Sequence, residues 1–287
     1  MKRRADRSLR VFVFGAGNAG RGLARALRRA GARVTLRAAR SGIPRRVRAD
    51  LIVLAVRDGL VASVAREMAD SGSVGAESAV VHIAGALGPD VLAPLRGACA
   101  GVGQMHPLVS FASRDTTPQL MGASVHVQGD RIAVARARRA ARTIGMKPWT
   151  QKGLDNVRYH AAAGFVANGA AALAAIATEL LVAAGIPRAR TPGMLGPLIR
   201  SVGDNVESLG LPDALTGPVR RGDAATVEHH VQVIRATVPG AFGLYVESVR
   251  AQLGLARQIG DAAPEKLAEI ARIIASLWLA SKGTRDV

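Results

Sequence analysis

The chain has 287 residues, enough for one large domain or for two ordinary domains that each have a core. Hydrophobic residues make up 49% of it and aromatic residues only 3%, so the cores must consist mainly of Ala, Val, Leu and Ile. The formal net charge is +18, from 39 Lys and Arg against 21 Asp and Glu. These basic residues are spread along the chain, and few aromatic rings are present to stack on bases. Nucleic acid is therefore not the expected partner.

The first element in chain order is an apolar strand over residues 9–14, which leads into a glycine-rich turn, a helix-forming run and a second strand from Arg33 to Leu36. Strand, Gly-x-Gly-x-x-Gly, helix and strand together form the dinucleotide-binding fingerprint. The first glycine permits a tight turn, the second lets the backbone approach a pyrophosphate, and the third lets the helix pack on the strand. The pyrophosphate would bind the free N–H groups at the start of the helix. The predicted cofactor-binding residues of this turn are Gly15, Gly17, Asn18, Ala19 and Gly20. The alternative is a strand-to-helix turn that binds nothing.

The end of the second strand indicates which dinucleotide is bound. NAD-specific sites usually place an acidic residue there for the ribose 2′-hydroxyl. The segment Leu36-Arg37-Ala38-Ala39-Arg40-Ser41 contains no acid. Arg offers a planar fork of donors to a 2′-phosphate, so Arg37, Arg40 and Ser41 favour NADP over NAD. Because Arg is abundant throughout the chain, their presence here by chance is the alternative. Val56 and Arg57, which follow the third strand, complete the predicted cofactor set.

The pattern up to residue 152 alternates between strands and helices. Further strands are predicted over residues 51–56, 79–83, 98–104, 124–127 and 147–150. Helices are predicted up to residue 69, over 89–96 and over 130–145. This alternation predicts an α/β domain with a doubly wound parallel sheet over residues 1–152.

From residue 153 onward the pattern is helical. Helices are predicted near 155–184, 192–209, 223–236, 241–258 and 264–281, which makes residues 153–287 an all-α domain for substrate binding and dimerisation. Residues 161–178 carry no charge and approach the length that spans a membrane. They are mostly Ala and include Gly164 and Gly169, so we expect a buried helix of the helical domain and no membrane partner.

The single cysteine, Cys99, excludes an intrachain disulfide and suits a reducing compartment. The basic start Met1-Lys2-Arg3-Arg4 leads into a strand and a glycine turn, where a signal peptide would have an apolar helix and a cleavage site. We therefore expect a cytoplasmic location.

Four stretches of the chain are typical of a known group of proteins: Val81-His82-Ile83-Ala84-Gly85-Ala86, residues 105–111, residues 159–168 and residues 215–223. With these motifs and its domain order, the chain resembles the 6-phosphogluconate dehydrogenase-like superfamily. Within that superfamily it is most similar to bacterial NADP oxidoreductases in which a Rossmann-like domain precedes a helical domain of unknown function. It is also similar to pyrroline-5-carboxylate reductase and ketopantoate reductase. The resemblance implies NADPH-dependent hydride transfer to or from a small keto, imino or hydroxy compound in an interdomain cleft. It also implies a homodimer built on the helical domain.

Candidate catalytic residues follow the strands, because ligands of α/β sheets bind outside the carboxyl ends of the strands. His106 ends a predicted strand and could polarise a carbonyl or imine, or relay a proton. The alternative is a histidine that only fixes its loop. His82 sits on an apolar strand, which favours a structural role. Gly85, in the loop after that strand, is predicted to contact substrate.

The first long helix carries two more candidate catalytic residues, His160 and Asn168. They lie about 80° apart around the helix axis and about 12 Å apart along it, so both can line one groove. Tyr159, about 180° from Asn168, is expected to face elsewhere. In the β-hydroxyacid dehydrogenase relatives this helix carries a Lys one turn before the Asn, but here that position is Gly164. The missing Lys supports the alternative function, a non-catalytic NADP(H)-binding sensor or scaffold.

The stretch over residues 215–223, before the helix predicted near 223–236, supplies the remaining candidates. Thr216 and Arg221 are predicted to bind an anionic substrate, and Asp223 to cap the helix that follows. His229 and His230 are adjacent in sequence and so point about 100° apart on a helix, which makes no metal pair. No metal site is predicted.

Overall fold

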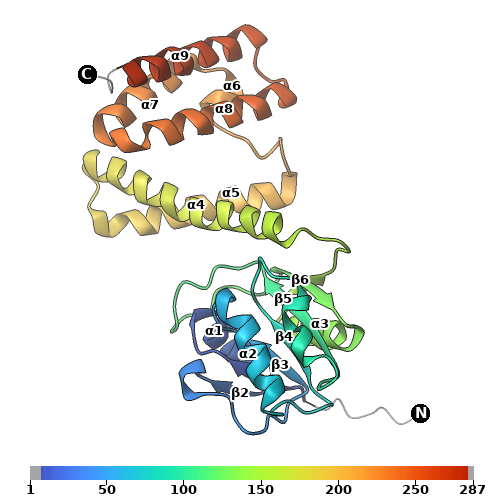
Figure 1. Cartoon of the computed structure of the whole chain (residues 1–287). Coiled ribbons are helices and arrows are strands. Elements are labelled where there is room, and N and C mark those ends of the chain that lie inside the picture. The colour runs from blue at the N-terminus through green and yellow to red at the C-terminus, as the bar shows by residue number, and fades with distance from the viewer. Residues whose placement is uncertain (1–7, 284–287) are drawn as a thin grey trace. The chain divides into compact units, whose positions relative to one another are not determined.

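The computed structural model describes residues 8–283, so the basic start Met1–Arg4 lies outside the described residues. The chain divides into two compact units (Figure 1). One extends to Ala167 and the other begins at Asn168. The predicted boundary at residue 152 is close to the start of the long helix α4 (Asn156–Ala183), whereas the division by compactness falls inside that helix.

The first unit contains one seven-stranded sheet in the order β2-β1-β3-β4-β5-β6-β7. Its strands are β1 (Arg10–Phe14), β2 (Arg33–Arg37), β3 (Leu51–Leu54), β4 (Ala79–His82), β5 (Gly101–Pro107), β6 (Ser124–Gly129) and β7 (Lys147–Trp149). All neighbours pair in parallel except β5 and β6. The prediction of a parallel sheet is therefore wrong at its β6–β7 edge, where both strands run opposite to β1–β5. The loop between β5 and β6 contains no helix that could carry the chain back to the same end of the sheet, and a parallel pair needs such a crossover.

Helices cover both faces of this sheet, which confirms the doubly wound arrangement. The first face packs on α1 (Asn18–Arg29) and α3 (Arg131–Thr143), through residues such as Val13, Val53 and Val81. The second face packs on α2 (Asp58–Asp70) and the 3-10 helix η2 (Pro89–Leu95), through Phe14, Leu54 and Val80. Successive strand residues point to opposite faces, so the fully apolar strands read from the sequence are buried on both sides.

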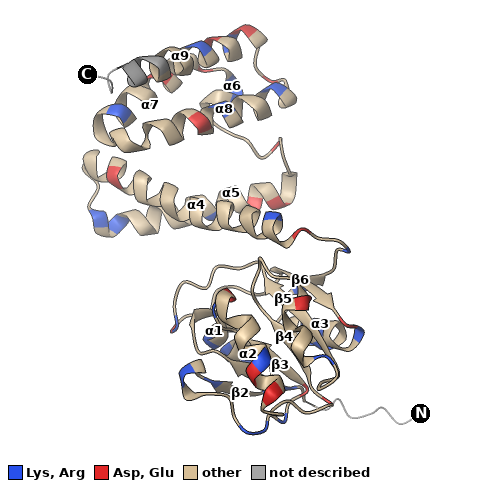
Figure 2. Cartoon of the chain, in the orientation of Figure 1, with Lys and Arg blue, Asp and Glu red and all other residues tan. Residues whose placement is uncertain are grey.

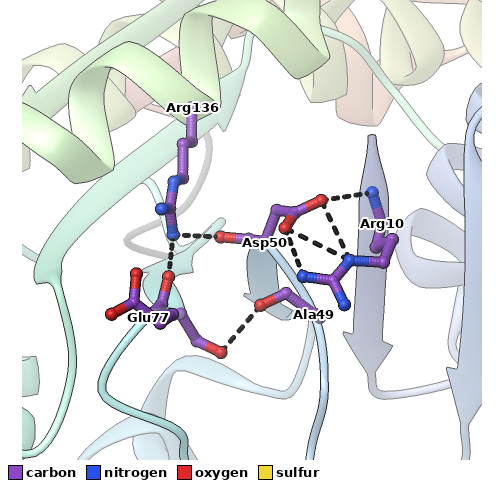
Figure 3. A network of polar contacts seen from close by, with 6 residues as sticks. Arg10, Ala49, Asp50, Glu77 and Arg136 are labelled. Carbon is purple, nitrogen blue, oxygen red and sulfur yellow. Dashed lines mark hydrogen bonds and ion pairs between the residues drawn. The ribbon is translucent and has the colours of Figure 1, made fainter. Parts of the chain in front are cut away.

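A polar network holds the amino ends of the strands together (Figure 3). Asp50, just before β3, accepts hydrogen bonds from the backbone N–H of Arg10 at 2.9 Å and from its guanidinium at 2.6 Å. Arg136 of α3 donates to the carbonyl oxygen of Asp50 at 2.7 Å and to that of Glu77. Ser78 Oγ donates to Ala49 O at 2.7 Å. This network lies at the opposite edge of the sheet from the strand ends where a ligand is expected.

The second unit is helical, as predicted. It contains the rest of α4, then α5 (Thr191–Leu209), α6 (Pro218–Arg221), α7 (Ala224–Thr237), α8 (Phe242–Ile259) and α9 (Pro264–Gly283), with the 3-10 helices η3 (Arg188–Arg190) and η4 (Pro239–Ala241) between them; η1 (Ala39–Ser41) belongs to the first unit. Val227, Val246 and Ile270 are central to a core that α6–α9 share. Asp223 caps α7, because its carboxylate accepts from Thr226 N at 3.1 Å and from Thr226 Oγ1 at 2.7 Å.

Helix α4 departs from the prediction of a buried helix. None of its 28 residues is buried, and Phe165 and Val166 are among the most exposed apolar side chains of the described chain. Among the described residues, α4 alone is long and apolar enough to cross a membrane by length and composition. Figure 2 shows that charged residues are almost absent from its middle. Its uncharged, Ala-rich composition is typical of a buried helix, but the described part of the single chain buries none of its side chains.

Candidate functional site

The glycine turn after β1 has the geometry that the fingerprint predicts. Gly15 has φ +116°, and a Cβ there would overlap the carbonyl oxygen of Ala55, the residue after β3. A Cβ on Gly20 would overlap the carbonyl oxygen of Gly15, so α1 reaches its close position only because residue 20 is glycine. A Cβ on Gly17 would meet no atom within 4 Å. The fold itself therefore does not require glycine at position 17, whereas a ligand that approaches the backbone would.

The N-terminus of α1 is open to an anion. Gly17 is its N-cap, no side chain caps the helix, and its first turn contains no acidic residue. The first N–H groups of a helix have no intrahelical partner, and the helix dipole favours negative charge there. Asn18 is tied elsewhere, because its Nδ2 donates to Phe111 O at 3.1 Å. We infer that the backbone of residues 18–20, more than the Asn18 side chain, is suited to a phosphate.

The glycine turn after β1 also lies where open α/β sheets bind their ligands. The chain leaves β1 for β2 on one side and returns to β3 on the other, so the direction of winding reverses between β1 and β3. Ligands of open α/β sheets bind in the crevice at this reversal. The predicted cofactor residue Val56 lies beside it, with its N 3.1 Å from an ideal Gly15 Cβ, and exposed Arg57 is the N-cap of α2.

The three residues predicted to select NADP lie at or just after the end of β2. They differ in whether their side chains already make hydrogen bonds within the protein. Arg37 donates from Nε to Gly42 O at 2.7 Å and from Nη2 to Ser41 O, which holds its own loop in place. Arg40 and Ser41 lie in η1 and are exposed. Of the two arginines, Arg40 is therefore the better placed to meet a 2′-phosphate.

A second group of predicted residues comes together at the carboxyl ends of β4 and β5. His106 of β5 lies against both Tyr159 and His160 of α4, with ring centroids 5.4 Å and 5.5 Å away and edge-to-face geometry. His106 Nδ1 and the Tyr159 hydroxyl are 3.2 Å apart. On the other side of the ring, a Cβ at Gly85 would overlap His160 Nδ1 and lie 2.7 Å from His106 Nε2. Glycine at position 85 thus allows both imidazoles to converge.

Burial controls the charge of this cluster. Burial, followed by the charges of His160, His126 and His82, lowers the pKa of His106 to about 4. His106 is therefore neutral at pH 7, with one ring nitrogen protonated and the other free to accept. Burial also raises the pKa of the Tyr159 phenol, which keeps its proton. His160 is exposed, whereas His106 is 9% exposed.

A buried polar network supports the cluster from below. Gln104 of β5 donates from Nε2 to Ala84 O at 2.7 Å and to Gly85 O at 3.3 Å, which fixes the loop that carries Gly85. Gln104 Oε1 accepts from Gln128 Nε2 at 2.7 Å, and His126 Nδ1 lies 3.2 Å from the same oxygen. Gln128 also donates to Asn156 Oδ1 at 2.9 Å, so the start of α4 is tied to β6.

Sequence reasoning missed several residues of this network. Tyr159 lies on the opposite side of α4 from Asn168, as its helical spacing predicts, but that side meets His106 and was not expected to line the site. Its ring packs against His106, His126 and Trp149, because the sheet lies against the face of α4 opposite to the one that carries Asn168. A signal was present in the sequence: Gln104, His106, His126 and Gln128 are polar residues at alternate positions of otherwise apolar strands. His82 is structural as expected, with Nε2 3.0 Å from Gly88 O.

The remaining candidates lie in the second unit. Asn168 is exposed on α4, Thr216 is exposed before α6, and Arg221 is exposed at the end of α6. Its neighbour Arg220 binds Asp261 at 2.8 Å and the carbonyl oxygens of Asp213 and Leu215, so that arginine has a structural role. Among the residues that the structure describes, no cluster of His, Cys, Asp or Glu could hold a metal ion.

Two protein families match successive parts of the chain, and the second match begins at β6, within the first compact unit. Residues 3–107 match the Rossmann-like domain family, and residues 123–251 match a domain of unknown function, DUF2520. No protein among those with curated descriptions matches this sequence.

Solved structures with the same fold cover nearly the whole chain. A Bacteroides fragilis protein described provisionally as an NADP oxidoreductase has a TM-score of 0.68 at 21% identity, over 85% of this chain and 98% of that one. A pyrroline carboxylate reductase from Plasmodium falciparum with NADP bound has a TM-score of 0.54 at 15% identity, over 85% and 98%. An imine reductase from Streptomyces aurantiacus has a TM-score of 0.53 at 19% identity, over 92% and 99%. At these identities the likeness establishes a shared fold.

Proposed function

We propose that this chain, in which a Rossmann-like domain precedes a DUF2520 domain, is an NADPH-dependent reductase that transfers hydride to or from a small keto, imino or hydroxy compound. One observation carries the proposal. A glycine turn with an uncapped helix N-terminus and a convergent pair of imidazoles both lie at the carboxyl edge of one sheet. The solved structures of the same fold that are described as NADP oxidoreductases and imine reductases support it.

The cofactor would be held at three places. The backbone N–H groups of residues 18–20 would bind the pyrophosphate, Gly17 would leave room for its approach, and Arg40 would meet the 2′-phosphate. A bound nicotinamide supplies the hydride chemistry, and the protein binds and orients. His160, His106 and Gly85 would contact or position the substrate.

Cofactor titration followed by fluorescence tests the first part of the proposal. We expect NADPH to bind more tightly than NADH. We expect Gly17→Ala to weaken both by about tenfold, roughly 1.4 kcal/mol, because the new methyl group lies where the pyrophosphate must approach. Gly254→Ala on α8, which also adds a methyl group where no atom lies within 4 Å, is the matched control. Tighter binding of NADH, or full affinity in Gly17→Ala, contradicts the proposal.

The choice between NADP and NAD is tested by Arg40→Ala. We expect this variant to lower the affinity for NADPH and to leave that for NADH unchanged, because only NADPH carries the 2′-phosphate. Arg29→Ala, which removes an exposed charge at the end of α1, controls for the general loss of positive charge. Equal losses for both cofactors would count against Arg40 as the selecting residue.

Turnover separates the reductase from the non-catalytic alternative. Imines and 2-keto acids are screened with NADPH on the wild type and on His106→Ala and Asn168→Ala. Tight NADPH binding without turnover of any compound would favour a sensor or scaffold, the function that Gly164 in place of Lys supports.

We further propose that the apolar surface of α4 and α5 is covered by a second copy of this chain. Both helices expose large apolar side chains over their length, among them Phe165, Leu173, Leu198, Val202 and Val206. Helix α5 also carries Arg200, Asp204 and Glu207, which a bilayer interior would not accept, and α4 is rich in Ala, which favours close helix packing over membrane insertion. Large apolar side chains exposed along two helices are typical of a surface that another subunit covers.

A further inference from the structure

His106, Tyr159 and His160 form a chain of neighbouring polar groups, with His106 in the middle. His106 is buried and its two ring nitrogens face different groups, Nδ1 the Tyr159 hydroxyl and Nε2 the side of Gly85 where His160 Nδ1 also lies. His160 is the exposed member. The cluster thus runs from a phenol, through a buried imidazole, to an imidazole that a ligand can reach.

The chemistry of the two groups favours one donor in the contact between Tyr159 and His106. A neutral imidazole has one nitrogen that accepts strongly, whereas a phenol oxygen is a good donor and a weaker acceptor. With Tyr159 OH as the donor to His106 Nδ1, 3.2 Å away, the proton of the neutral ring is on Nε2. No other hydrogen bond to either ring nitrogen of His106 competes within the described part of the chain.

The proton position on His106 in turn affects the neighbouring ring of His160. An ideal Gly85 Cβ would lie 2.7 Å from His106 Nε2 and closer still to His160 Nδ1, so both atoms border the space beside the Gly85 Cα. Two N–H groups cannot face each other at such a site without repulsion. With a proton on His106 Nε2, a lone pair is favoured over an N–H at His160 Nδ1, which leaves the N–H of that ring on Nε2.

We propose that Tyr159 and His106 are positioning residues that fix the ring and tautomer of His160, and that His160 is the residue that donates a hydrogen bond to the substrate. The part of this inference that concerns the substrate rests on the proposed function. The preferred substrate group is a neutral acceptor, a carbonyl oxygen or an imine nitrogen, because the cluster presents N–H donors and no carboxylate.

Histidine nitrogen NMR of the whole protein without cofactor tests the order directly. We expect the wild type at pH 7.5 to show His106 with Nε2 protonated and Nδ1 free. In Tyr159→Phe, which keeps the ring packing but removes the hydroxyl, we expect the His106 signals to become those of a mixture of tautomers. Assignments come from the loss of signals in His106→Gln and His160→Gln. A proton on His106 Nδ1 in the wild type, or no change in Tyr159→Phe, overturns the inference.

Tyr245→Phe is the matched control. Its hydroxyl lies 3.3 Å from His230 Nδ1 on α7, so the variant removes a similar tyrosine–histidine contact in the second unit. We expect it to leave the His106 and His160 signals unchanged. A shift of His106 in this control as large as in Tyr159→Phe would show a general structural effect and would overturn the assignment of the order.

Turnover with NADPH and an imine or keto substrate then tests the role of His160. We expect His160→Gln to lower kcat by about a hundredfold or more and Tyr159→Phe by about tenfold, with KM for NADPH unchanged in both. Full kcat in His160→Gln would overturn the catalytic part of the inference. If no compound is turned over while the tautomers behave as expected, the proposed reductase function fails and the order of the cluster stands.

Discussion

The environment of a single residue, His106, changes what its side chain can do. In the sequence it is a histidine before a proline, equally suited to acid–base chemistry and to fixing a loop. In the structure it lies within β5, opposite His126 of β6, and is 9% exposed. Burial holds it neutral at pH 7, so it cannot serve as a cationic acid there and is better suited to orient a neighbour.

The lowered pKa of His106 predicts a dependence of stability on pH. Its pKa is about 4 in the folded protein, against about 6.5 for a free histidine. Between these values the unfolded chain binds a proton that the folded chain does not, so the free energy of unfolding falls as the pH drops from 6.5 towards 4. We expect urea denaturation to show a shallower loss of stability over this range in His106→Gln than in the wild type.

The exposed His229 provides the control for that measurement. His229→Gln, on the outer side of α7, should leave the slope of stability against pH as in the wild type. Because His82 and His126 also have lowered pKa values through burial, part of the slope should remain in His106→Gln. An unchanged slope in His106→Gln would contradict the assignment of His106 as a buried neutral imidazole.

At the scale of elements, the two ends of the strands differ: their amino ends form a stabilised edge of the sheet, and their carboxyl ends form the edge that carries the candidate site. Side chains at the amino ends of β1, β3 and β4 are tied together by Arg10, Asp50 and Arg136 (Figure 3). The carboxyl ends instead hold the glycine turn and the imidazole cluster. Parallel strands create this division, because all of their carboxyl ends meet at one edge.

The pair Arg10–Asp50 offers a test of the stabilised edge. The hydrogen bond from the Arg10 side chain lowers the pKa of Asp50. We expect Asp50→Asn to lower the free energy of unfolding by about 1 kcal/mol, a value that allows for the partial solvent exposure of the pair. The stabilisation is complete above the unfolded carboxyl pKa of about 3.9 and is lost as the pH falls through the lower folded value.

Denaturation of both proteins at pH 7 and at about pH 2.5 measures this difference. Glu179→Gln is the control, because Glu179 pairs with Arg188 at 2.7 Å on a more exposed surface and should contribute less. If Asp50→Asn lowers the free energy of unfolding equally at both pH values, the charge of Asp50 is not the source of the stabilisation.

At the scale of the whole molecule, the unexplained feature is the amount of apolar surface on α4 and α5. None of the residues of α4 is buried in the single chain, although the sequence pattern is that of a buried helix. In a homodimer the same helices would gain the layer of side chains that the chain itself does not supply. The cytoplasmic location stays a prediction from the sequence.

Analytical ultracentrifugation tests the homodimer. We expect a dimer at micromolar concentration, and a shift towards monomer when Leu198→Glu and Val202→Glu place charges on the exposed side of α5. Val233→Glu, at a similarly exposed position of α7, should leave the dimer intact. A wild-type monomer that sediments with lipid vesicles would indicate instead that a membrane covers this surface.

Much of the architecture was readable from the sequence because it depends on local patterns. Strand and helix periods, the glycine turn and the Asp223 cap are short-range features, and the long helices from α5 to α9 begin and end within a residue or two of their predicted limits. The 3-10 form of η2, with Pro94 inside it, and the short helix α6 were not predicted, because both are too short to show a period.

The sequence by itself therefore determined the two-part α/β and all-α organisation and the place of the dinucleotide fingerprint, since both follow from spacing along the chain. Only the tertiary structure decided that β6 runs antiparallel, that Arg37 is occupied by its own loop, and that Tyr159 belongs with His106. These features depend on which residues distant in sequence lie next to one another. The packing of α4 on the sheet determines which of its residues meet β5, β6 and β7, and helical periodicity cannot specify this.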